Sequence, residues 1–332
     1  MTKHDAVVRW AMLLGLLVFA SPGVVMAQPL PPFKEVHVVF LIDRSGSMQT
    51  VRSLDNRQRF AVGMQMAREA VEAGSSLPRY MAVWSFENNS YQVHQDFTTE
   101  PQLIFNALSA LQAGSGTTPL AYSACEAVNK LRGFRTNVFA QKRIELSSDG
   151  QENDSPIGSE CQGSDSPAMD PQSWQWKVRN KLRTGNAQNT NVPPTGYEIV
   201  SHITFFGSFL TLRDGGSEVV PEVSRDGRLV ADASIPAPTG GPFVRYLRTI
   251  AEESGGRLTV VEDNQPVPAL GDVDRNGCVN NVDLDLVLAN FGNTVPPGDK
   301  RADINGDFIV DYNDYSMVIA QWGMGGRCNV TF

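Results

Sequence analysis

An apolar run at residues 35–43 constrains the fold of this chain more than any other feature. Its sequence, EVHVVFLID, is nearly continuous in apolar residues and shows no polar–apolar alternation. Strands that are buried on both faces read this way, and such strands belong to parallel sheets that helices cover on both sides. The run therefore predicts an α/β protein in which this segment is a central parallel strand.

Further strand and helix patterns alternate over residues 34–262, and this alternation predicts a doubly wound, mostly parallel α/β sheet. Ligand sites in such sheets lie at the carboxyl ends of the strands, so the residues just after each strand are the candidates. The expected strands are 81–86, 91–97, 144–146, 198–206 and 257–261, and the expected helices are 60–71, 120–131 and 243–253.

Two segments interrupt the alternation. Residues 150–196 are mostly polar, with one expected helix near Trp174 to Leu182, and residues 211–241 are rich in Gly and Pro. Each follows a strand, so we expect both insertions to hang over the ligand-binding end. Trp174 and Trp176 are expected to pin the first insertion to the domain; the alternative is a sugar-stacking or protein-contact surface.

The N-terminus has the pattern of a signal peptide over residues 1–27. Lys3 and Arg9 precede an apolar run from Trp10 to Ala20, and Ala27 is the last residue of a small-residue cleavage signal. The run is too short to span a bilayer comfortably, although an uncleaved signal anchor is the alternative. We therefore expect a secreted protein, extracellular or in the periplasm or cell envelope, with no membrane-spanning segment.

The four cysteines of an exported chain are expected to form disulfides. Cys125 and Cys161 lie in the first large region, and Cys278 and Cys328 lie in the tail. The simplest pairing respects that division, while spacing alone leaves the other two connectivities open.

Charge and motifs exclude several functions. The formal net charge is −8, from 28 basic and 36 acidic residues, which argues against a nucleic-acid partner because phosphates need a basic face. The sequence carries no H-E-x-x-H zinc motif, no G-x-S-x-G elbow and no Walker loop. We therefore expect no catalytic residues and no enzymatic activity.

Residues with oxygen-bearing side chains follow two of the expected strands and lie at the start of one expected helix. The three segments are Asp43 to Ser47, Gly116 to Leu120, and Ser147 to Gly150. Mg²⁺ prefers six hard oxygens and usually keeps some waters, so hydroxyls and carboxylates at one sheet edge suit it. With few anionic ligands, the cation would stay electron-poor, and a carboxylate from a partner could complete its shell.

These three segments resemble the metal-ion-dependent adhesion site of the von Willebrand factor type A family, and the resemblance covers residues 34–262. It implies a Rossmann-like fold, a divalent cation (Mg²⁺, or Mn²⁺ or Ca²⁺) and a protein ligand that offers a carboxylate. Thr117 is the alternative to Thr118, and Ser148 stands where the family commonly has Thr. The implied metal ligands, called the adhesion site below, are Asp43, Ser45, Ser47, Thr118 and Asp149.

The tail, residues 271–329, contains two copies of a repeat with a period of 31 residues. Positions 1, 3, 5, 7, 9 and 12 match an EF-hand-type calcium loop. In the first loop they are Asp272, Asp274, Asn276, Cys278, Asn280 and Asp283, and in the second Asp303, Asn305, Asp307, Ile309, Asp311 and Asp314. The following apolar stripes, Leu284, Val287, Leu288 and Phe291 and then Tyr315, Val318, Ile319 and Trp322, predict two helices that pack together.

The repeat pair resembles a type I dockerin over residues 271–323, after a linker at 263–270. The resemblance implies a small all-α domain of paired EF-hand-like loops, two bound Ca²⁺ ions, and a cohesin-like or cell-surface partner. Phe308 replaces the usual Gly at position 6 of the second loop. Residues 281–282 and 312–313 lack the Ser/Thr pairs of many cohesin-binding dockerins, so calcium binding is the firmer expectation.

These features together predict an exported, metal-dependent protein-binding or adhesion module with a calcium-stabilised attachment tail. Two alternatives remain at this point. One is a dockerin-tethered hydrolase associated with extracellular polysaccharide, and the other is a purely structural protein of the envelope or matrix.

Overall fold

The computed structural model describes residues 33–150, 152–166, 169–189, 196–207, 241–326 and 328. The expected signal peptide at 1–27 lies outside the described residues. The Gly- and Pro-rich segment 211–241 also lies outside them except for Gly241, as do short parts of 150–196.

One sheet forms the centre of the larger domain. Its strand order over the described residues is β3-β2-β1-β4-β5-β6, and every neighbouring pair is parallel except β2 and β3. The predicted doubly wound, mostly parallel α/β sheet is therefore confirmed. The strands are β1 (Glu35–Asp43), β2 (Arg79–Glu87), β3 (Ser90–Thr98), β4 (Ala140–Ser148), β5 (Val200–Gly207) and β6 (Leu258–Glu262).

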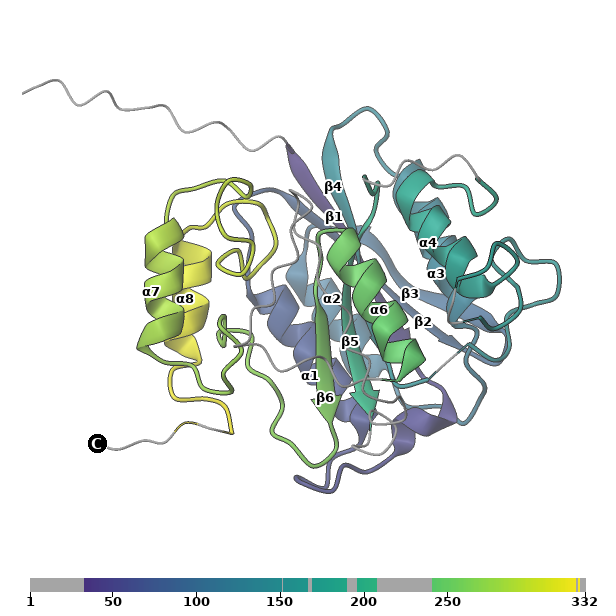
Figure 1. The fold of residues 1–332 in the computed structure, drawn as a ribbon, viewed down its shortest axis with the longest axis horizontal. Helices are drawn as coiled ribbons and strands as arrows, with labels where there is room; N and C mark the ends of the chain where they lie inside the picture. The colour runs from purple at the N-terminus through teal and green to yellow at the C-terminus, as the bar shows by residue number, and fades with distance from the viewer. Residues whose placement is uncertain are drawn as a thin grey trace, which may run out of the picture.

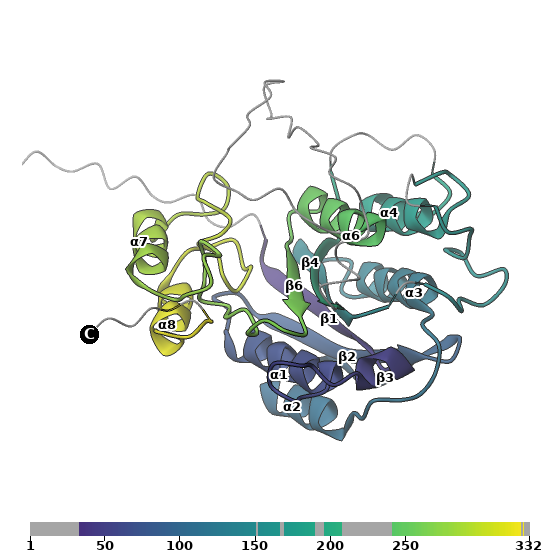
Figure 2. The same cartoon turned by 60° about the horizontal axis from the view of Figure 1, so that its bottom comes forward.

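Helices cover both faces of this sheet, as Figure 2 shows. Along β1, Val39 and Leu41 enter one core and Val38, Phe40 and Ile42 enter the other, so the strand is buried on both faces as its composition predicts. One layer consists of α3 (Leu120–Gly133), α4 (Trp174–Thr184) and α6 (Pro242–Glu253), and the other of α1 (Arg59–Glu72) and α2 (Pro101–Ala110).

Helix α2 is absent from the sequence-based expectation. It begins with Pro at the first helical turn, and its fully buried positions are Ile104 and Leu108. Two apolar residues four positions apart make a narrow stripe on a short helix, and such a stripe is hard to distinguish from a loop.

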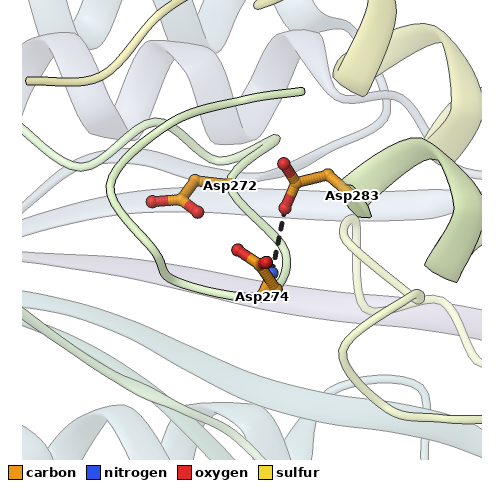
Figure 3. Close-up of side chains that lie close together, drawn as sticks. All are labelled: Asp272, Asp274 and Asp283. Atoms are coloured by element: carbon orange, nitrogen blue, oxygen red, sulfur yellow. Dashed lines mark hydrogen bonds between the residues drawn. The ribbon is translucent and has the colours of Figure 1, made fainter. Parts of the chain in front are cut away.

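The tail is a separate pair of helices, α7 (Asn281–Asn290) and α8 (Tyr312–Ala320), beside the larger domain (Figure 1). Each helix follows one of the two expected loops, and the carboxylates of the first loop are drawn in Figure 3. The two repeats pair reciprocally. Val279 donates to the carbonyl of Met324 and accepts from Gly323, and Val310 makes the same pair of bonds with Asn293 and Gly292.

The apolar stripes of the tail are only half buried. Val287 and Val318 have no exposed surface, and Leu284 and Tyr315 pack against the same small core. The remaining members stay 44–49% exposed: Leu288, Phe291, Ile319 and Trp322. The expectation that the two helices pack together therefore holds for the first half of each stripe, and the second half faces solvent.

Both disulfides of the simplest pairing form, Cys125 with Cys161 and Cys278 with Cys328. The first ties α3 to the segment after β4, and the second ties the first loop to the end of the tail. Across the described residues, none of the helices combines the length and the apolar character that a membrane span requires.

Candidate metal sites

The loop after β1 is shaped by contacts with the loop before α3. The Ser45 amide donates to Asp43 Oδ1 at 2.7 Å, and the Gly46 amide donates to the carbonyl of Gly116 at 2.9 Å. A Cβ on Gly46 would lie 3.2 Å from the carbonyl oxygen of Ser115, so the two loops approach closely because residue 46 lacks a side chain. A short 3-10 turn, η1 (Gly46–Gln49), then leads away from the sheet.

Five residues of this region form one oxygen-rich network at the carboxyl ends of β1 and β4. Ser45 Oγ lies 3.1 Å from Ser47 Oγ, and Ser47 Oγ donates to Asp149 Oδ1 at 2.6 Å. Ser148 Oγ donates to Asp43 Oδ2 at 2.6 Å. The structure thus brings the Asp43 and Asp149 segments together, and Ser148, which departs from the family pattern, holds Asp43 in place.

The structure distinguishes the two adjacent threonines. Thr118 is buried, and its Oγ1 lies 3.0 Å from where a Cβ on Gly150 would be, next to Asp149. Thr117 is exposed, and its hydroxyl donates to Asp154. Thr118 therefore lies beside the other adhesion-site residues, while the Thr117 hydroxyl is engaged by the segment after β4.

Burial makes Asp43 a carboxylate that needs a nearby cation. Its side chain is fully enclosed, and burial raises its pKa to about 6, helped by the negative charge of Asp149 and opposed by the hydrogen bonds from Ser148 and Ser45. A divalent cation among these oxygens would offset the cost of burial. The donor set contains only hard oxygens, which fits Mg²⁺ or Mn²⁺.

An arginine absent from the sequence-based site also contacts Asp149. Arg59, the first residue of α1, places Nη1 2.6 Å from Asp149 Oδ2. Its Nη2 and Nε donate to the two carboxylate oxygens of Asp263 at 2.5 and 3.0 Å. Asp263 follows β6 and begins the expected linker. No local sequence signal identifies this pairing, because the partners lie far apart in the chain.

Residues 150–196 contact both the adhesion site and the core of the larger domain. The segment begins at the adhesion site: Glu152 Oε2 accepts from the amide of Ala121, Asn153 Oδ1 from that of Thr118, and Ser155 Oγ from that of Tyr122. These contacts cap the first turn of α3, which has no capping side chain of its own. The chain then turns back, and α4 lies on the sheet. The start of the segment thus lies at the ligand-binding end, and its helix packs in the same core as α3 and α6.

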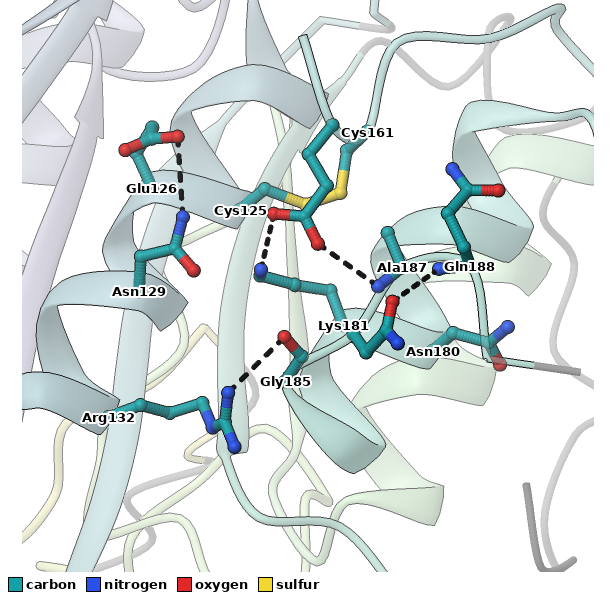
Figure 4. A network of polar contacts seen from close by, with 12 residues as sticks. Cys125, Glu126, Asn129, Arg132, Cys161, Asn180, Lys181, Gly185, Ala187 and Gln188 are labelled. Atoms are coloured by element: carbon teal, nitrogen blue, oxygen red, sulfur yellow. Dashed lines mark hydrogen bonds and ion pairs between the residues drawn. A yellow bond between two sulfur atoms is a disulfide. The ribbon is translucent and has the colours of Figure 1, made fainter. Parts of the chain in front are cut away.

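Helix α4 is fastened to α3 by the network in Figure 4. The disulfide from Cys161 reaches Cys125 on α3, Lys181 pairs with Glu160, and the amide of Ala187 donates to Glu160 at 3.2 Å. The helix expected near Trp174 to Leu182 is therefore confirmed as α4, and its buried apolar residues recur at every fourth position, namely Trp174, Val178 and Leu182.

Trp174 confirms the expectation that a tryptophan pins this segment. It is 1% exposed, and its ring lies 5.2 Å from that of Tyr246 and 6.1 Å from that of Phe243. Its indole Nε1 donates to Asp165 at 3.2 Å. Trp176 is only half buried.

The first loop of the tail gathers carboxylates. Asp272, Asp274 and Asp283 each offer one oxygen, and these oxygens lie within 4.8 Å of one another (Figure 3). Asp272 Oδ1 is buried and has no hydrogen-bond partner within the described residues. A buried acceptor without a partner is costly, and a calcium ion among the three carboxylates would satisfy it. The loop therefore fits Ca²⁺.

The second loop repeats the bonding pattern of the first. At position 12, Asp283 Oδ1 accepts from the amides of positions 2 and 3 at 2.6 and 3.0 Å, and Asp314 Oδ1 does the same at 2.6 and 3.2 Å. The other oxygen of each accepts from position 9 at 2.9 Å in a capping box. Burial and the charges of Asp314 and Asp307 raise the pKa of Asp303 to about 8, and a cation among these carboxylates would favour the charged form.

The remaining expected ligands stand at equivalent places in their loops. At position 5, Asn276 Oδ1 accepts from the amide of Cys278 at 2.9 Å, and Asp307 Oδ1 accepts from that of Ile309 at 3.1 Å. At position 9, Asn280 and Asp311 cap α7 and α8. At position 3, Asn305 is buried within the second loop.

Phe308 does not change the shape of the second loop. Positions 4 and 6 are left-handed in both loops, with φ of +63° and +91° at Arg275 and Gly277 and of +71° and +69° at Gly306 and Phe308. Each loop thus has one glycine for two left-handed positions, and the second loop has moved it from position 6 to position 4. A non-glycine residue in this region costs about 1 kcal/mol.

Comparison with known proteins agrees with the fold and the first site. Residues 38–151 match the model of the von Willebrand factor type A domain family, so the predicted domain of this type is confirmed there. The matched residues contain the whole adhesion site and exclude the tail, whose likeness to a dockerin stays a prediction. No curated protein matches the chain.

Several solved structures resemble this chain at low identity. A conserved hypothetical protein, BatB, from Bacteroides thetaiotaomicron is 12% identical, with 68% of this chain and 90% of that chain covered and a TM-score of 0.41. An aerotolerance-related membrane protein from Bacteroides fragilis is 14% identical, with 69% and 93% covered and a TM-score of 0.39. Proximal thread matrix protein 1 from the mussel byssus, with zinc in its adhesion motif, is 14% identical, with 54% and 39% covered and a TM-score of 0.36.

Proposed function

We propose that this protein is an exported binding module that grips an acidic group on a protein partner through a divalent cation at the adhesion site. The observation that carries the proposal is the convergence of Asp43, Ser45, Ser47 and Asp149 in one hydrogen-bonded network, with Thr118 beside it. The family match over the same residues supports it. The charged and apolar pattern of residues 1–27 supports export.

The adhesion-site residues divide into neutral and charged groups. The hydroxyls of Ser45, Ser47 and Thr118 would hold the cation directly, and Asp43 and Asp149 would supply charge and hold its waters. When bound, the cation acts as a Lewis acid that a partner carboxylate can ligate. Because Arg59 offsets part of the charge of Asp149, the site attracts a further anion more readily than two free carboxylates would.

The tail is proposed to hold two Ca²⁺ ions and to attach the protein to another molecule. The four half-exposed apolar residues of α7 and α8, Leu288, Phe291, Ile319 and Trp322, support an attachment role. They come from matching positions of the two repeats and flank the same helix pair. A cohesin-like or cell-surface protein is the proposed class of partner.

A non-enzymatic role is part of the proposal. Ion binding at a set of hydroxyls and carboxylates needs no nucleophile or general base, and the larger domain and the tail occupy nearly all of the chain after residue 34. A tethered polysaccharide hydrolase would release reducing sugar from polysaccharides. A purely structural protein would retain no partner in a metal-dependent way.

The test is a pull-down from the secretome with the mature protein, in Mg²⁺ and in chelator, with the retained proteins identified by mass spectrometry. The variant is Asp43→Asn, which keeps the size of a fully buried side chain and removes its charge. Asp96→Asn is the matched control, because Asp96 is exposed on β3, far from the adhesion-site residues in sequence, and forms an exposed ion pair with Lys130.

We expect retained proteins in Mg²⁺, none in chelator, none with Asp43→Asn, and the full set with Asp96→Asn. Retention that is equal in Mg²⁺ and in chelator would overturn the adhesion role. Direct titration of the two variants with Mg²⁺ then shows whether the metal itself is lost.

A further inference from the structure

The second loop of the tail contacts the larger domain through its own expected calcium ligands. The Ser76 amide donates to Asp307 Oδ2 at 2.6 Å, and Ser75 Oγ donates to the same oxygen at 3.3 Å. Ser76 Oγ donates to Asp311 Oδ2. Ser75 and Ser76 lie between α1 and β2, at the end of the sheet opposite the adhesion site.

Two arginines of the sheet complete this contact. Arg143 of β4 donates to the carbonyls of Asn305 and Gly306 at 2.8 and 3.0 Å, and Arg257, just before β6, donates to that of Ile304 at 3.4 Å. Arg143 is 2% exposed and pairs with Glu145 at 3.1 Å. The buried guanidinium of Arg143 needs acceptors, and the second loop supplies two of them.

The residues that distinguish the second loop from the first lie at this contact. A Cβ on Gly306 would fall 2.5 Å from Arg143 Nη1, so the glycine at position 4 permits the close approach. The ring of Phe308 lies 4.9 Å from that of Phe33, which stacks on Phe139 at 4.9 Å. The exchange of glycine between positions 4 and 6 is thus explained by docking onto the sheet.

We infer that the loop between α1 and β2, together with Arg143 and Arg257, forms a docking site for the second loop, and that calcium binding and docking stabilise each other. This inference rests on the calcium binding proposed above. It adds that the second loop of the tail binds the larger domain of the same chain. We call this contact the latch.

Two carboxylates connect calcium binding with docking, because each is an expected calcium ligand and also contacts Ser76. The Oδ2 atoms of Asp307 and Asp311 face Ser76, while their Oδ1 atoms accept amides within the tail at 3.1 and 2.7 Å. Without an ion, the carboxylates of the loop repel one another and loosen the backbone that Arg143 and Arg257 bind. A contact that favours the ordered loop must raise its calcium affinity by the same factor by which calcium favours the contact.

The latch also divides the two repeats by role. In the second repeat Asn313, which follows position 10, donates to Ser76 Oγ at 3.1 Å, so this face is committed within the chain. In the first repeat the equivalent residue, Val282, is 53% exposed. At this position the first repeat is therefore left available to an external partner, in addition to the exposed apolar residues near the ends of both helices.

The first experiment follows amide hydrogen exchange at residues 73–78 of the intact mature protein by mass spectrometry, in calcium and in chelator. Calorimetric titration of the same sample counts the calcium ions. We expect two ions, and exchange of the Ser76 amide about tenfold faster in chelator, within the usual range of coupling between sites. If two ions bind but the exchange rate of the Ser76 amide is the same in calcium and in chelator, the latch is wrong and the calcium loops remain supported. Absence of calcium binding would overturn both.

The second experiment measures calcium release after mixing with excess chelator. The variant Ser76→Asp places a carboxylate against Asp307 and Asp311, and Ser109→Asp makes the same change on the exposed end of α2 as a matched control. We expect a fast and a slow phase, with the slow phase about tenfold faster in Ser76→Asp only. Identical release from both variants and the unaltered protein would overturn the latch.

Discussion

Arg59 Nη1 lies 2.6 Å from Asp149 Oδ2, so the Asp149 carboxylate contacts the hydroxyl of Ser47 through one oxygen and the buried guanidinium of Arg59 through the other. The same guanidinium binds Asp263, the first residue after β6. The adhesion site is therefore connected, through one side chain, to the segment that leads into the tail.

Replacing Arg59 by Gln should strengthen divalent metal binding. A positive charge beside a ligand carboxylate opposes a cation there, and its removal should raise Mg²⁺ affinity by roughly tenfold, since even in a screened protein environment such a charge is worth more than 1 kcal/mol. Isothermal titration at constant ionic strength measures this. Stability should fall by about 3 kcal/mol, because Asp263 and Asp149 lose a buried partner.

The matched control for that change is Arg57→Gln. Arg57 carries the same charge two residues away, is 41% exposed in its side chain, and pairs with Asp55. It should leave Mg²⁺ affinity within about twofold, because exposed charges are screened. Weaker metal binding in the Arg59 variant would show that the arginine supports the site instead of opposing the cation.

The centre of the fold could be predicted from sequence because its signals are local. The uninterrupted apolar run of β1 requires burial on both faces, and the oxygen-bearing residues that follow it stand at a strand end by rule. Arg59 and Asp263 could not be predicted, because their pairing depends on how distant strand and helix ends meet. A helix near Trp174 could be predicted from its apolar spacing, but its packing beside α3 could not, because the disulfide and polar contacts that join the two helices come from distant residues.

Trp174→Ala tests whether α4 is an integral layer of the larger domain. The side chain is buried against Phe243 and Tyr246, so its truncation should cost about 3–5 kcal/mol in the free energy of unfolding. Urea unfolding followed by far-UV circular dichroism measures the loss. Trp176→Ala is the control on the same helix and should cost much less, since Trp176 is half buried. Equal costs would contradict the assignment of α4 to the core.

The tail shows the same limit of sequence reasoning at a smaller scale. Its loops could be predicted, because twelve-residue spacing of carboxylates is a local pattern and repeats in register. The substitution at Phe308 could be noticed in the sequence but not explained there. Its reason lies in Phe33 and Arg143, which only the folded chain brings to the second loop.

The start of β1 should make stability dependent on pH. Two hydrogen bonds from Arg135 hold the pKa of Glu35 below its ordinary value of 4.5, and burial lowers the pKa of His37 below 6.5. Both folded pKa values are depressed, so each contribution is present above the unfolded pKa and is lost as the pH falls through the folded one. Stability should thus decline from about pH 6.5 downward, with a further loss below about pH 4.5.

Arg135→Gln isolates the Glu35 part of this dependence. The variant should be less stable than the unaltered protein at pH 7, and the difference should shrink below pH 4.5 as Glu35 is protonated in both. Urea unfolding at several pH values in chelator measures the difference. Arg132→Gln, which removes an exposed pair with Glu198, should show little effect at any pH. A difference that grows in acid would contradict the linkage.

The two disulfides should stabilise different parts of the molecule. Cys278 and Cys328 are separated by 50 residues, and the chain-entropy relation assigns such a closed loop about 4 kcal/mol. Replacing both by Ser should therefore lower the unfolding temperature of the tail in calcium, as measured by scanning calorimetry. The matched double variant, Cys125→Ser with Cys161→Ser, opens a loop of similar entropy and places hydroxyls at two fully buried positions beside α3. It should lower the transition of the larger domain instead. If both variants lower the temperature of one common transition equally, the tail and the larger domain unfold as a single cooperative unit. That result would contradict separate stabilisation by the two disulfides.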